Sequence, residues 1–167
     1  MNTMSARLAG LAASLVGWLS VAGPALAQQE HQHQHVGAAV ANLQLNAGHK
    51  WATDAPLRSG MAAIRGAFDA DHPAIHAGKE TDAQYAALAE RIQSQVNTIV
   101  ANCHLPEAAD ANLHYVIADL SQGANLMRGQ DPARTRHDGA ALVHGALIAY
   151  GKYFDDPDWV AEPAMKH

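Results

Sequence analysis

The sequence is poor in the residues that would assign a function directly. Cysteine occurs once among 167 residues, as Cys103, which excludes a framework of intramolecular disulfides. Aromatic residues make up only 5% of the chain, and runs of β-branched residues are rare, which argues against an all-β fold. Lysine and arginine total 11 against 16 aspartate and glutamate residues, and they form no basic block. Nucleic acid is therefore excluded as a partner.

The motifs of familiar catalytic centres are also missing. The sequence has no G-x-S-x-G nucleophile elbow, no H-E-x-x-H zinc motif and no glycine-rich phosphate loop, because its 13 glycines are scattered. The lone thiol, Cys103, is expected to be buried and away from any catalytic triad. We therefore predict that the protein is not an enzyme.

The remaining features are an apolar composition and an N-terminal segment with the pattern of an export signal. Hydrophobic residues make up 49% of the chain and charged residues 16%, which suffices to bury a core, and the length fits one domain. Residues 1–27 have the pattern of a secretory signal, since Arg7 precedes an apolar run from Leu8 to Val21 and Ala25-Leu26-Ala27 fits the cleavage rule. A membrane anchor is the alternative, but the apolar run is shorter than the roughly 20 residues a span requires. We expect an exported, soluble periplasmic protein without a membrane span after cleavage.

Apolar residues recur at helical spacing in four stretches, which are separated by short turns. Helices are predicted from Asp54 to Gly78, from Thr81 or Asp82 to Cys103, from Glu107 to Met127, and from Asp131 to about Phe154. Pro73 predicts a kink or a restart within the first of them. Short connections favour antiparallel neighbours, so the predicted fold class is all-α, an antiparallel up-down-up-down four-helix bundle preceded by an irregular lead-in. The predicted divisions after the signal are a histidine-rich tail and lead-in at 28–53, the bundle at 54–156 and a C-terminal tail at 157–167.

Three segments carry a resemblance to a known family. They are GHKWATDAPLRSGM from Gly48 to Met61, NCHLPE from Asn102 to Glu107 continuing to Leu113-His114, and YGKYFD from Tyr150 to Asp155. In these segments the chain resembles a family of small exported bacterial proteins, some of them called DnrO-like. The layout is also similar to the periplasmic bundles of cytochrome b562 and cytochrome c′, although the C-x-x-C-H motif for covalent haem is missing. The resemblance implies a four-helix fold and a periplasmic location, and it implies no active site.

Helical geometry predicts which candidate ligands face the core, because each residue advances 100° around the axis. Met61 and Cys103 fall on the apolar stripes of the first and second helices. His114 falls at the edge of the stripe on the third helix. If the first helix survives Pro73, His72 faces inward as well. On the fourth helix, His137 and His144 point away from the stripe and are expected to be exposed to solvent.

Histidine is the clearest compositional excess, with 11 residues, all after the predicted signal. His31, His33 and His35 alternate in a polar tail that is expected to be mobile, where imidazoles can converge on Cu(II), Ni(II) or Zn(II). A second group is predicted from height along the bundle, and it contains His72, His76 and His137. Each candidate also has a purely structural interpretation: a solvated tail, a core methionine at Met61, a small buried apolar residue at Cys103, and an edge histidine with one hydrogen bond at His114.

These features favour metal handling, and we predict an exported bundle that binds copper for buffering or transfer. The predicted metal ligands are His31, His33, His35, Met61, His72, His76, Cys103 and His114. One alternative is a metal-free module that docks a periplasmic protein partner through Trp51, Trp159 and the segment from Tyr150 to Asp155. The other alternative is electron transfer by haem b, with Met61 and His114 at similar heights as axial ligands.

Overall fold

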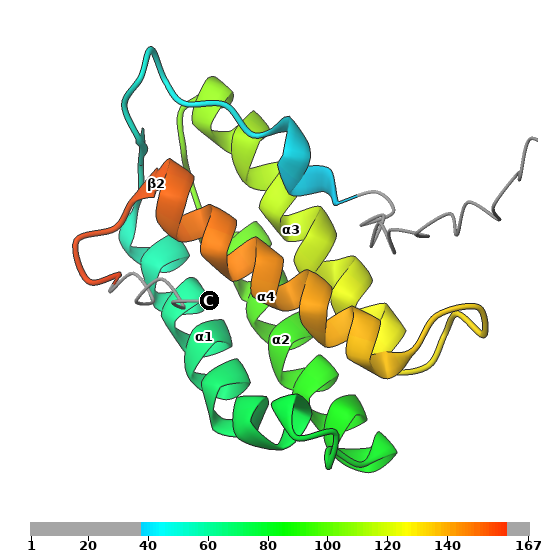
Figure 1. The fold of residues 1–167 in the computed structure, drawn as a ribbon. Coiled ribbons are helices and arrows are strands. Elements are labelled where there is room, and N and C mark those ends of the chain that lie inside the picture. The colour runs from blue at the N-terminus through cyan, green and yellow to red at the C-terminus, as the bar shows by residue number, and fades with distance from the viewer. Residues whose placement is uncertain (1–37, 160–167) are drawn as a thin grey trace, which may run out of the picture. The chain divides into compact units, whose positions relative to one another are not determined.

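The computed structural model describes residues 38–159, which fold as four helices with a short 3-10 turn and two short strands (Figure 1). Among these residues, successive helices run antiparallel and pack side by side, so the predicted all-α four-helix bundle is confirmed. In chain order the elements are η1 (Ala39–Asn42), β1 (Trp51–Ala52), α1 (Ala55–His76), α2 (Asp82–Asn102), α3 (Glu107–Met127), α4 (Arg136–Tyr153) and β2 (Phe154–Asp155).

Side-chain caps set where three of the helices begin. The carboxylate of Asp54 accepts a hydrogen bond from the amide of Leu57 at 2.9 Å and starts α1. Thr81 forms a capping box with Gln84 at the start of α2. Thr135 forms another with Asp138, so α4 begins at Arg136. Each box satisfies amide groups that a helix otherwise leaves without partners.

The start predicted for the fourth helix at Asp131 is therefore wrong. Asp131 uses its side chain to accept a hydrogen bond from the amide of Ala133, which fixes a turn. The box that starts the helix was present in the sequence, since Thr135 and Asp138 have the spacing of that motif. An aspartate-proline pair resembles a helix start, but here it forms the loop before one.

Pro73 does not split α1, which continues to His76 as one helix. The proline lies in the last turn, where its missing amide hydrogen removes a single bond to the carbonyl of Asp69. Gly78 then ends the helix with φ of +64°, a conformation that glycine adopts without strain.

The helices pack around one core, and glycines set the closest approaches. Gly123 on α3 faces Gly139 on α4, and a Cβ added at Gly139 would lie 2.6 Å from the Gly123 carbonyl oxygen. Between α1 and α2, a Cβ at Gly60 would lie 2.4 Å from the side chain of Ile99. Backbones this close leave no room for larger side chains, which explains why these helix positions are glycine.

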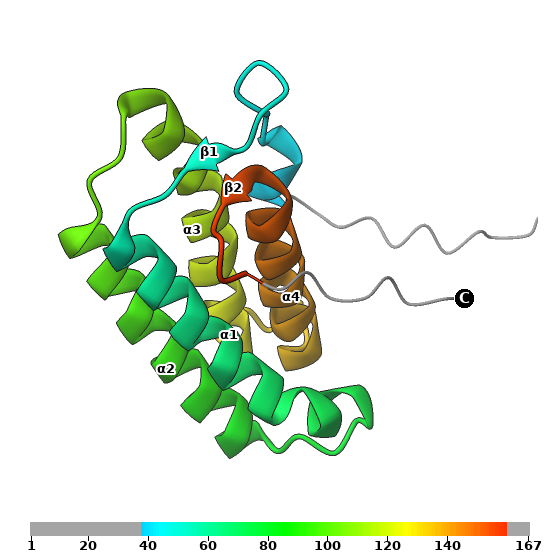
Figure 2. The same ribbon diagram turned by 90° about the vertical axis from the view of Figure 1, so that its left-hand side faces the viewer.

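The lead-in and the segment that follows α4 up to Trp159 close one end of the bundle. Strands β1 and β2 pair in parallel, with Trp51 opposite Phe154, and so join the entrance of α1 to the exit of α4 (Figure 2). Trp159 packs edge-on against Tyr150 at 4.7 Å between ring centroids. The boundary predicted at residue 156 therefore leaves out a residue that covers the core.

Candidate functional site

Two histidines from different helices stack on one core phenylalanine. Phe68 on α1 is 2% exposed, and the rings of His72 and His144 both stack on it at 5.5 Å between centroids. The centroids of His72 and His144 are 5.4 Å apart. The three rings form a nearly equilateral triangle at the contact of α1 with α4. Both imidazoles are half-buried, so each has an apolar side against the core and an edge toward solvent.

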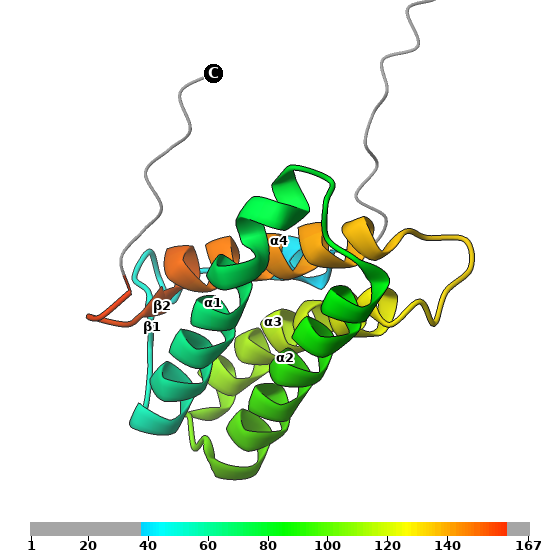
Figure 3. The ribbon, with the colours of Figure 1, turned by 90° about the horizontal axis from the view of Figure 1, so that it is seen from below.

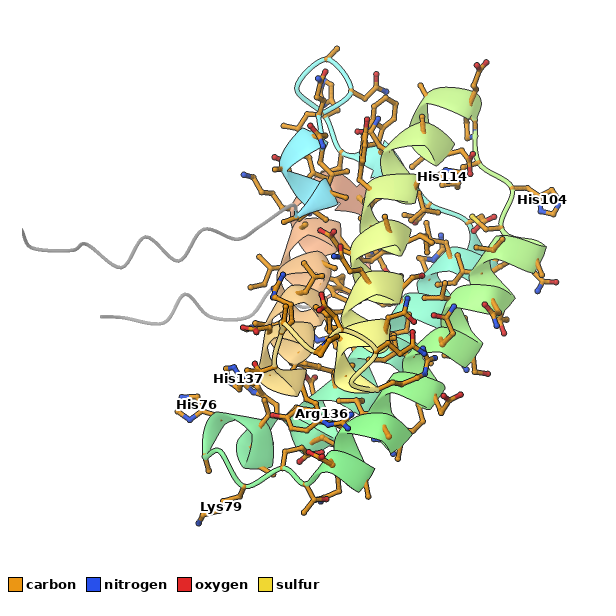
Figure 4. The ribbon with its side chains drawn as sticks, turned by 90° about the vertical axis from the view of Figure 1, so that its right-hand side faces the viewer. His76, Lys79, His104, His114, Arg136 and His137 are labelled. Carbon is orange, nitrogen blue, oxygen red and sulfur yellow. The ribbon has the colours of Figure 1, made fainter. Side chains whose placement is uncertain are left out.

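His76 extends this group by one turn of α1. Its ring centroid lies 6.2 Å from that of His72, in an edge-on arrangement, and the residue is exposed. We refer to His72, His76 and His144 as the histidine cluster. Figure 4 shows His76 at the end of α1 with His137 close to it in that view. Figure 3, seen from below, also brings the end of α1 near the start of α4.

The histidine cluster does not form a finished three-ligand site. Within residues 38–159, no three His, Cys, Asp or Glu side chains are placed so that they could hold a metal ion together. The cluster instead provides a pair of imidazoles, His72 and His144, with His76 beside them. Two imidazoles that share a tetrahedral ion at about 2.1 Å have ring centroids about 5 Å apart, which is close to the spacing of this pair.

The cluster corrects one prediction on the fourth helix. His137 is exposed, as expected, but His144 is half-buried between α4 and α1, so its predicted exposure is wrong. The apolar stripe of α4 is broad because the helix packs against both α3 and α1. On the helical projection His144 lies only about 40° beyond Ala140, which is buried. The predicted inward orientation of His72 agrees with its stacking on Phe68.

Cys103 lies at the end of α2 and is held by Asp54. It caps the helix through its amide, and its half-buried side chain packs against the core rather than lying fully inside it. Burial, together with the charge of Asp54 and a hydrogen bond to its carboxylate, raises the pKa of the Cys103 thiol to about 12. The thiol therefore stays protonated at neutral pH and is a weak metal ligand and nucleophile as it stands.

Asp54 holds the turn between α2 and α3 as well as the start of α1. One carboxylate oxygen accepts from Leu57, and the other accepts from the amide of His104 at 2.7 Å. Burial raises the pKa of Asp54, but the hydrogen bonds from His104, Leu57 and Cys103 outweigh it, so the pKa lies below its usual value. The sequence predicts Asp54 as the start of the first helix and gives no sign of this second role.

Met61 and His114 are not brought together. Met61 is completely buried in the core. The side chain of His114 is 71% exposed, and its Nδ1 lies 2.8 Å from the carbonyl oxygen of Asp110 on its own helix. Figure 4 shows His114 and His104 at the end of the helices away from His76. This arrangement gives no support to axial ligation of a haem by the pair.

The tryptophans that could anchor a partner have internal roles. Trp51 donates a hydrogen bond from Nε1 to the carbonyl oxygen of Gln44 at 2.7 Å and packs against the core. Trp159 lies on Tyr150, and the guanidinium of Arg65 lies 4.8 Å from its ring. Both residues cover an end of the bundle, which favours the structural interpretation of their position.

Two buried carboxylates were missed in the sequence. Asp119 on α3 is fully buried and accepts hydrogen bonds from the amides of Ala39 and Val40 at 2.7 and 3.0 Å, which fixes η1 to the bundle. Asp156 is 9% exposed and accepts a hydrogen bond from the hydroxyl of Tyr150 at 2.9 Å. An aspartate on an otherwise apolar helix stripe was the available signal for Asp119.

The segments that carry the family resemblance meet at one end of the bundle. β1 pairs with β2, and Lys50 donates from Nζ to the carbonyl oxygen of Gly151 at 2.7 Å. Asp54, in the first segment, binds the amide of His104, in the second. The segments therefore build one structural unit that holds the entrance of α1 and the exit of α4.

Comparison of the chain with protein-family models, with curated proteins and with solved structures gave no match. The family resemblance stays a prediction. In the part of the chain that the structure describes, no helix is both long and apolar enough to cross a membrane. The predicted ligands His31, His33 and His35 and the signal at 1–27 lie outside the described residues.

Proposed function

We propose that this protein binds a late transition metal ion through histidine, with copper as the favoured ion, for buffering or transfer. The observation that carries the proposal is that the ring centroids of His72 and His144 lie 5.4 Å apart at the contact of α1 with α4. Imidazole is a ligand suited to copper, zinc and nickel.

The surroundings of the pair support this use. Phe68 fixes both rings from the core side, so they are positioned before any ion arrives. The ring centroid of His76 lies 6.2 Å from that of His72, at the exposed edge of the cluster. Rotation of the His76 side chain would bring a third imidazole toward the pair. A site open to solvent, with two imidazoles in place and a third nearby, suits exchange of an ion more than permanent storage.

Export is part of the same proposal and rests on the signal pattern of residues 1–27. The histidines that follow this segment belong to the proposed metal binding. His31, His33 and His35 would supply a second set of imidazoles for Cu(II). Cys103 and Met61 no longer belong to the favoured site, since the thiol is held by Asp54 and the methionine is buried in the core. We keep the histidines as the proposed ligands.

The test is a titration of the chain from residue 28 onward, purified without a tag, with Cu(II) and separately with Zn(II). The double variant His72→Ala/His144→Ala should lose one binding event and keep the others. The triple variant His31→Ala/His33→Ala/His35→Ala should lose a different event. If neither variant changes the stoichiometry or the affinity, the proposal is wrong.

A matched control comes from histidines outside the cluster. The double variant His137→Ala/His114→Ala also removes two imidazoles, but both are exposed. It should leave binding at the pair unchanged. Equal losses in the control and in the cluster variant would show nonspecific binding by surface histidines and would contradict the proposed site.

A further inference from the structure

A shallow cavity of about 600 Å³, largely open to solvent, lies at the end of the bundle where the α1–α2 and α3–α4 loops meet. Its volume is in the range of pockets that bind small organic molecules. Figure 4 shows Arg136 and His137 at this end of the helices, with Lys79 below them in that view. Glu80, in the α1–α2 loop, and Tyr85, on α2, line one side of the cavity. Arg134, in the α3–α4 loop, and Arg136, on α4, line the other side.

Glu80 is the one residue of this wall with an unsatisfied buried carboxylate. Both of its carboxyl oxygens are shielded from solvent, and neither has a hydrogen-bond partner in the described part of the chain. Burial, and then the charge of Asp71, raise the pKa of Glu80, and Arg91 opposes them. Arg91 is already paired with Asp71. A carboxylate held in this way lacks a donor that the folded chain does not supply.

The arginines in the wall are committed elsewhere and do not neutralise Glu80. Arg136 Nε lies 3.0 Å from Asp82 Oδ1, and Arg136 also donates to the carbonyl oxygen of Met127. Arg134 Nε lies 3.5 Å from Asp138 Oδ2. With these ion pairs formed, neither arginine of the wall is left to pair with Glu80, which favours a cationic occupant beside this carboxyl group.

The rest of the lining favours an organic cation over a metal ion. Among residues 38–159 no three metal-ligating side chains converge, here or elsewhere. Asp82 is taken by Arg136, and Asp131 Oδ1 accepts the amide of Ala133 at 2.9 Å. Tyr85, a residue that is 6% exposed, contributes the edge of an aromatic side chain, and Pro132 adds apolar surface. An aromatic ring beside a carboxylate is suited to a primary alkylammonium group.

We propose that this cavity binds a small primary alkylammonium ligand, with the Glu80 carboxylate as its counter-ion and acceptor. Because both carboxyl oxygens are shielded in the folded chain, the side chain of Glu80 would turn toward the cavity to accept the N–H groups of the ligand, which supply the donors it lacks. The alkyl chain of the ligand would lie against Tyr85 and Pro132. The inference is independent of the metal proposed above, because it uses a different cavity and none of the histidine cluster.

The experiment is a titration of the full chain with n-butylammonium, followed by isothermal calorimetry and by amide chemical shifts, with a chelator present. The expected result is saturable binding with a Kd of about 1 mM or tighter, with shifts confined to the two loops. n-Butanol, which has the same chain length and no charge, should bind at least about tenfold more weakly. Absence of saturation by about 20 mM, or equal binding of the alcohol, would overturn the proposal.

The decisive variant is Glu80→Gln, which keeps the shape of the side chain and removes its charge. The Kd for n-butylammonium should rise at least about tenfold. Glu107→Gln is the matched control, since it removes the same charge from an exposed position at the start of α3, and it should bind as the unmodified chain does. Unchanged binding by Glu80→Gln, or an equal loss in Glu107→Gln, would refute the role of Glu80. The variant His72→Ala/His144→Ala should also bind normally, which separates this result from the metal proposal.

Discussion

The imidazole rings of His72 and His144 lie 5.4 Å apart, one on α1 and the other on α4, and both stack on Phe68. This relationship joins the first and last helices of the bundle at a point where polar side chains meet the core. Removing Phe68 therefore tests how the pair is positioned. Phe68→Leu keeps an apolar side chain but removes the stacking surface, so metal affinity should fall about tenfold while the histidines remain. The affinity of Phe68→Leu should be compared by calorimetry with that of Ile64→Leu, which changes the same helix one turn earlier and should bind normally.

Glycines at the contact of α3 with α4 give a stability prediction with an internal control. Gly139→Ala should lower the free energy of unfolding by about 2 kcal/mol, because the new Cβ would meet the backbone of α3 at 2.6 Å. Gly145→Ala lies on the same helix with nothing within 4 Å of the added Cβ. It should raise the free energy of unfolding by up to about 1 kcal/mol through helix propensity. Urea denaturation of the two variants measures both; equal effects would contradict the close packing.

The two roles of Asp54 predict that its replacement changes both the stability of the protein and the reactivity of the Cys103 thiol. Asp54→Ala should lower the free energy of unfolding by about 2 kcal/mol, since the amides of Leu57 and His104 both lose their acceptor. It should also lower the pKa of Cys103 from about 12, because the charge and the hydrogen bond of Asp54 are removed while burial remains. The rate of reaction with a disulfide reagent at pH 9 measures the second effect.

The control for this experiment is Asp155→Asn, which changes an exposed carboxylate in β2. It should change neither the stability nor the thiol rate. The pKa of Asp54 is depressed in the folded protein, so its contribution is present above the ordinary pKa of 3.8 and is lost as pH falls through the depressed value. A thiol rate that does not increase in Asp54→Ala would contradict the hydrogen bond between the two side chains.

The contribution of Glu80 to the stability of the folded protein should depend on pH in the opposite direction to that of Asp54. Its pKa is raised in the folded protein, so the folded state holds the proton more tightly than the unfolded state does. Stability should therefore fall as pH rises from the ordinary pKa of 4.5 through the raised value. Glu80→Gln should remove this loss and be more stable than the unmodified chain at pH 7.5, but not at pH 4. Thermal or urea denaturation at the two pH values measures the difference, and an advantage that does not grow with pH would contradict the burial of this carboxylate.

Near the end of α4, the hydroxyl of Tyr150 and the carboxylate of Asp156 form a buried polar contact. Tyr150→Phe should lower the free energy of unfolding by about 1 to 2 kcal/mol, because Asp156 keeps its place and loses the hydroxyl donor. Tyr153→Phe removes a hydroxyl from a half-buried neighbour whose ring centroid lies 5.1 Å from the ammonium nitrogen of Lys152. Its effect should be below about 0.5 kcal/mol. Similar losses in the two variants, measured by urea denaturation, would argue against the buried hydrogen bond.

The sequence predicted the helices well because their signals are local. Spacing of apolar residues and the caps at Asp54 and Thr81 needed no knowledge of the fold, and the prediction failed where two local signals competed, at Asp131 and Thr135. The burial of His144 was not predictable from one helix, because it depends on α1 packing against a second face of α4.

The candidate site was predicted in part for the same reason. Height along the bundle predicts His72, His76 and His137 as one group, whereas the structure places His144 beside His72. Asp119 and Glu80 were missed because their importance depends on what surrounds them: two amides of the lead-in for Asp119, and an absence of partners among residues 38–159 for Glu80. Sequence spacing carries neither kind of information.

The most direct test of the central claim is a Zn(II) titration followed through the ring nitrogen and carbon resonances of the histidines. Zn(II) is diamagnetic, so the rings that bind it can be assigned individually. The account predicts saturating shifts at His72 and His144, with His76 following and His137 and His114 unchanged. Shifts confined to His31, His33 and His35, or spread evenly over all exposed histidines, would contradict a metal site at the contact of α1 with α4.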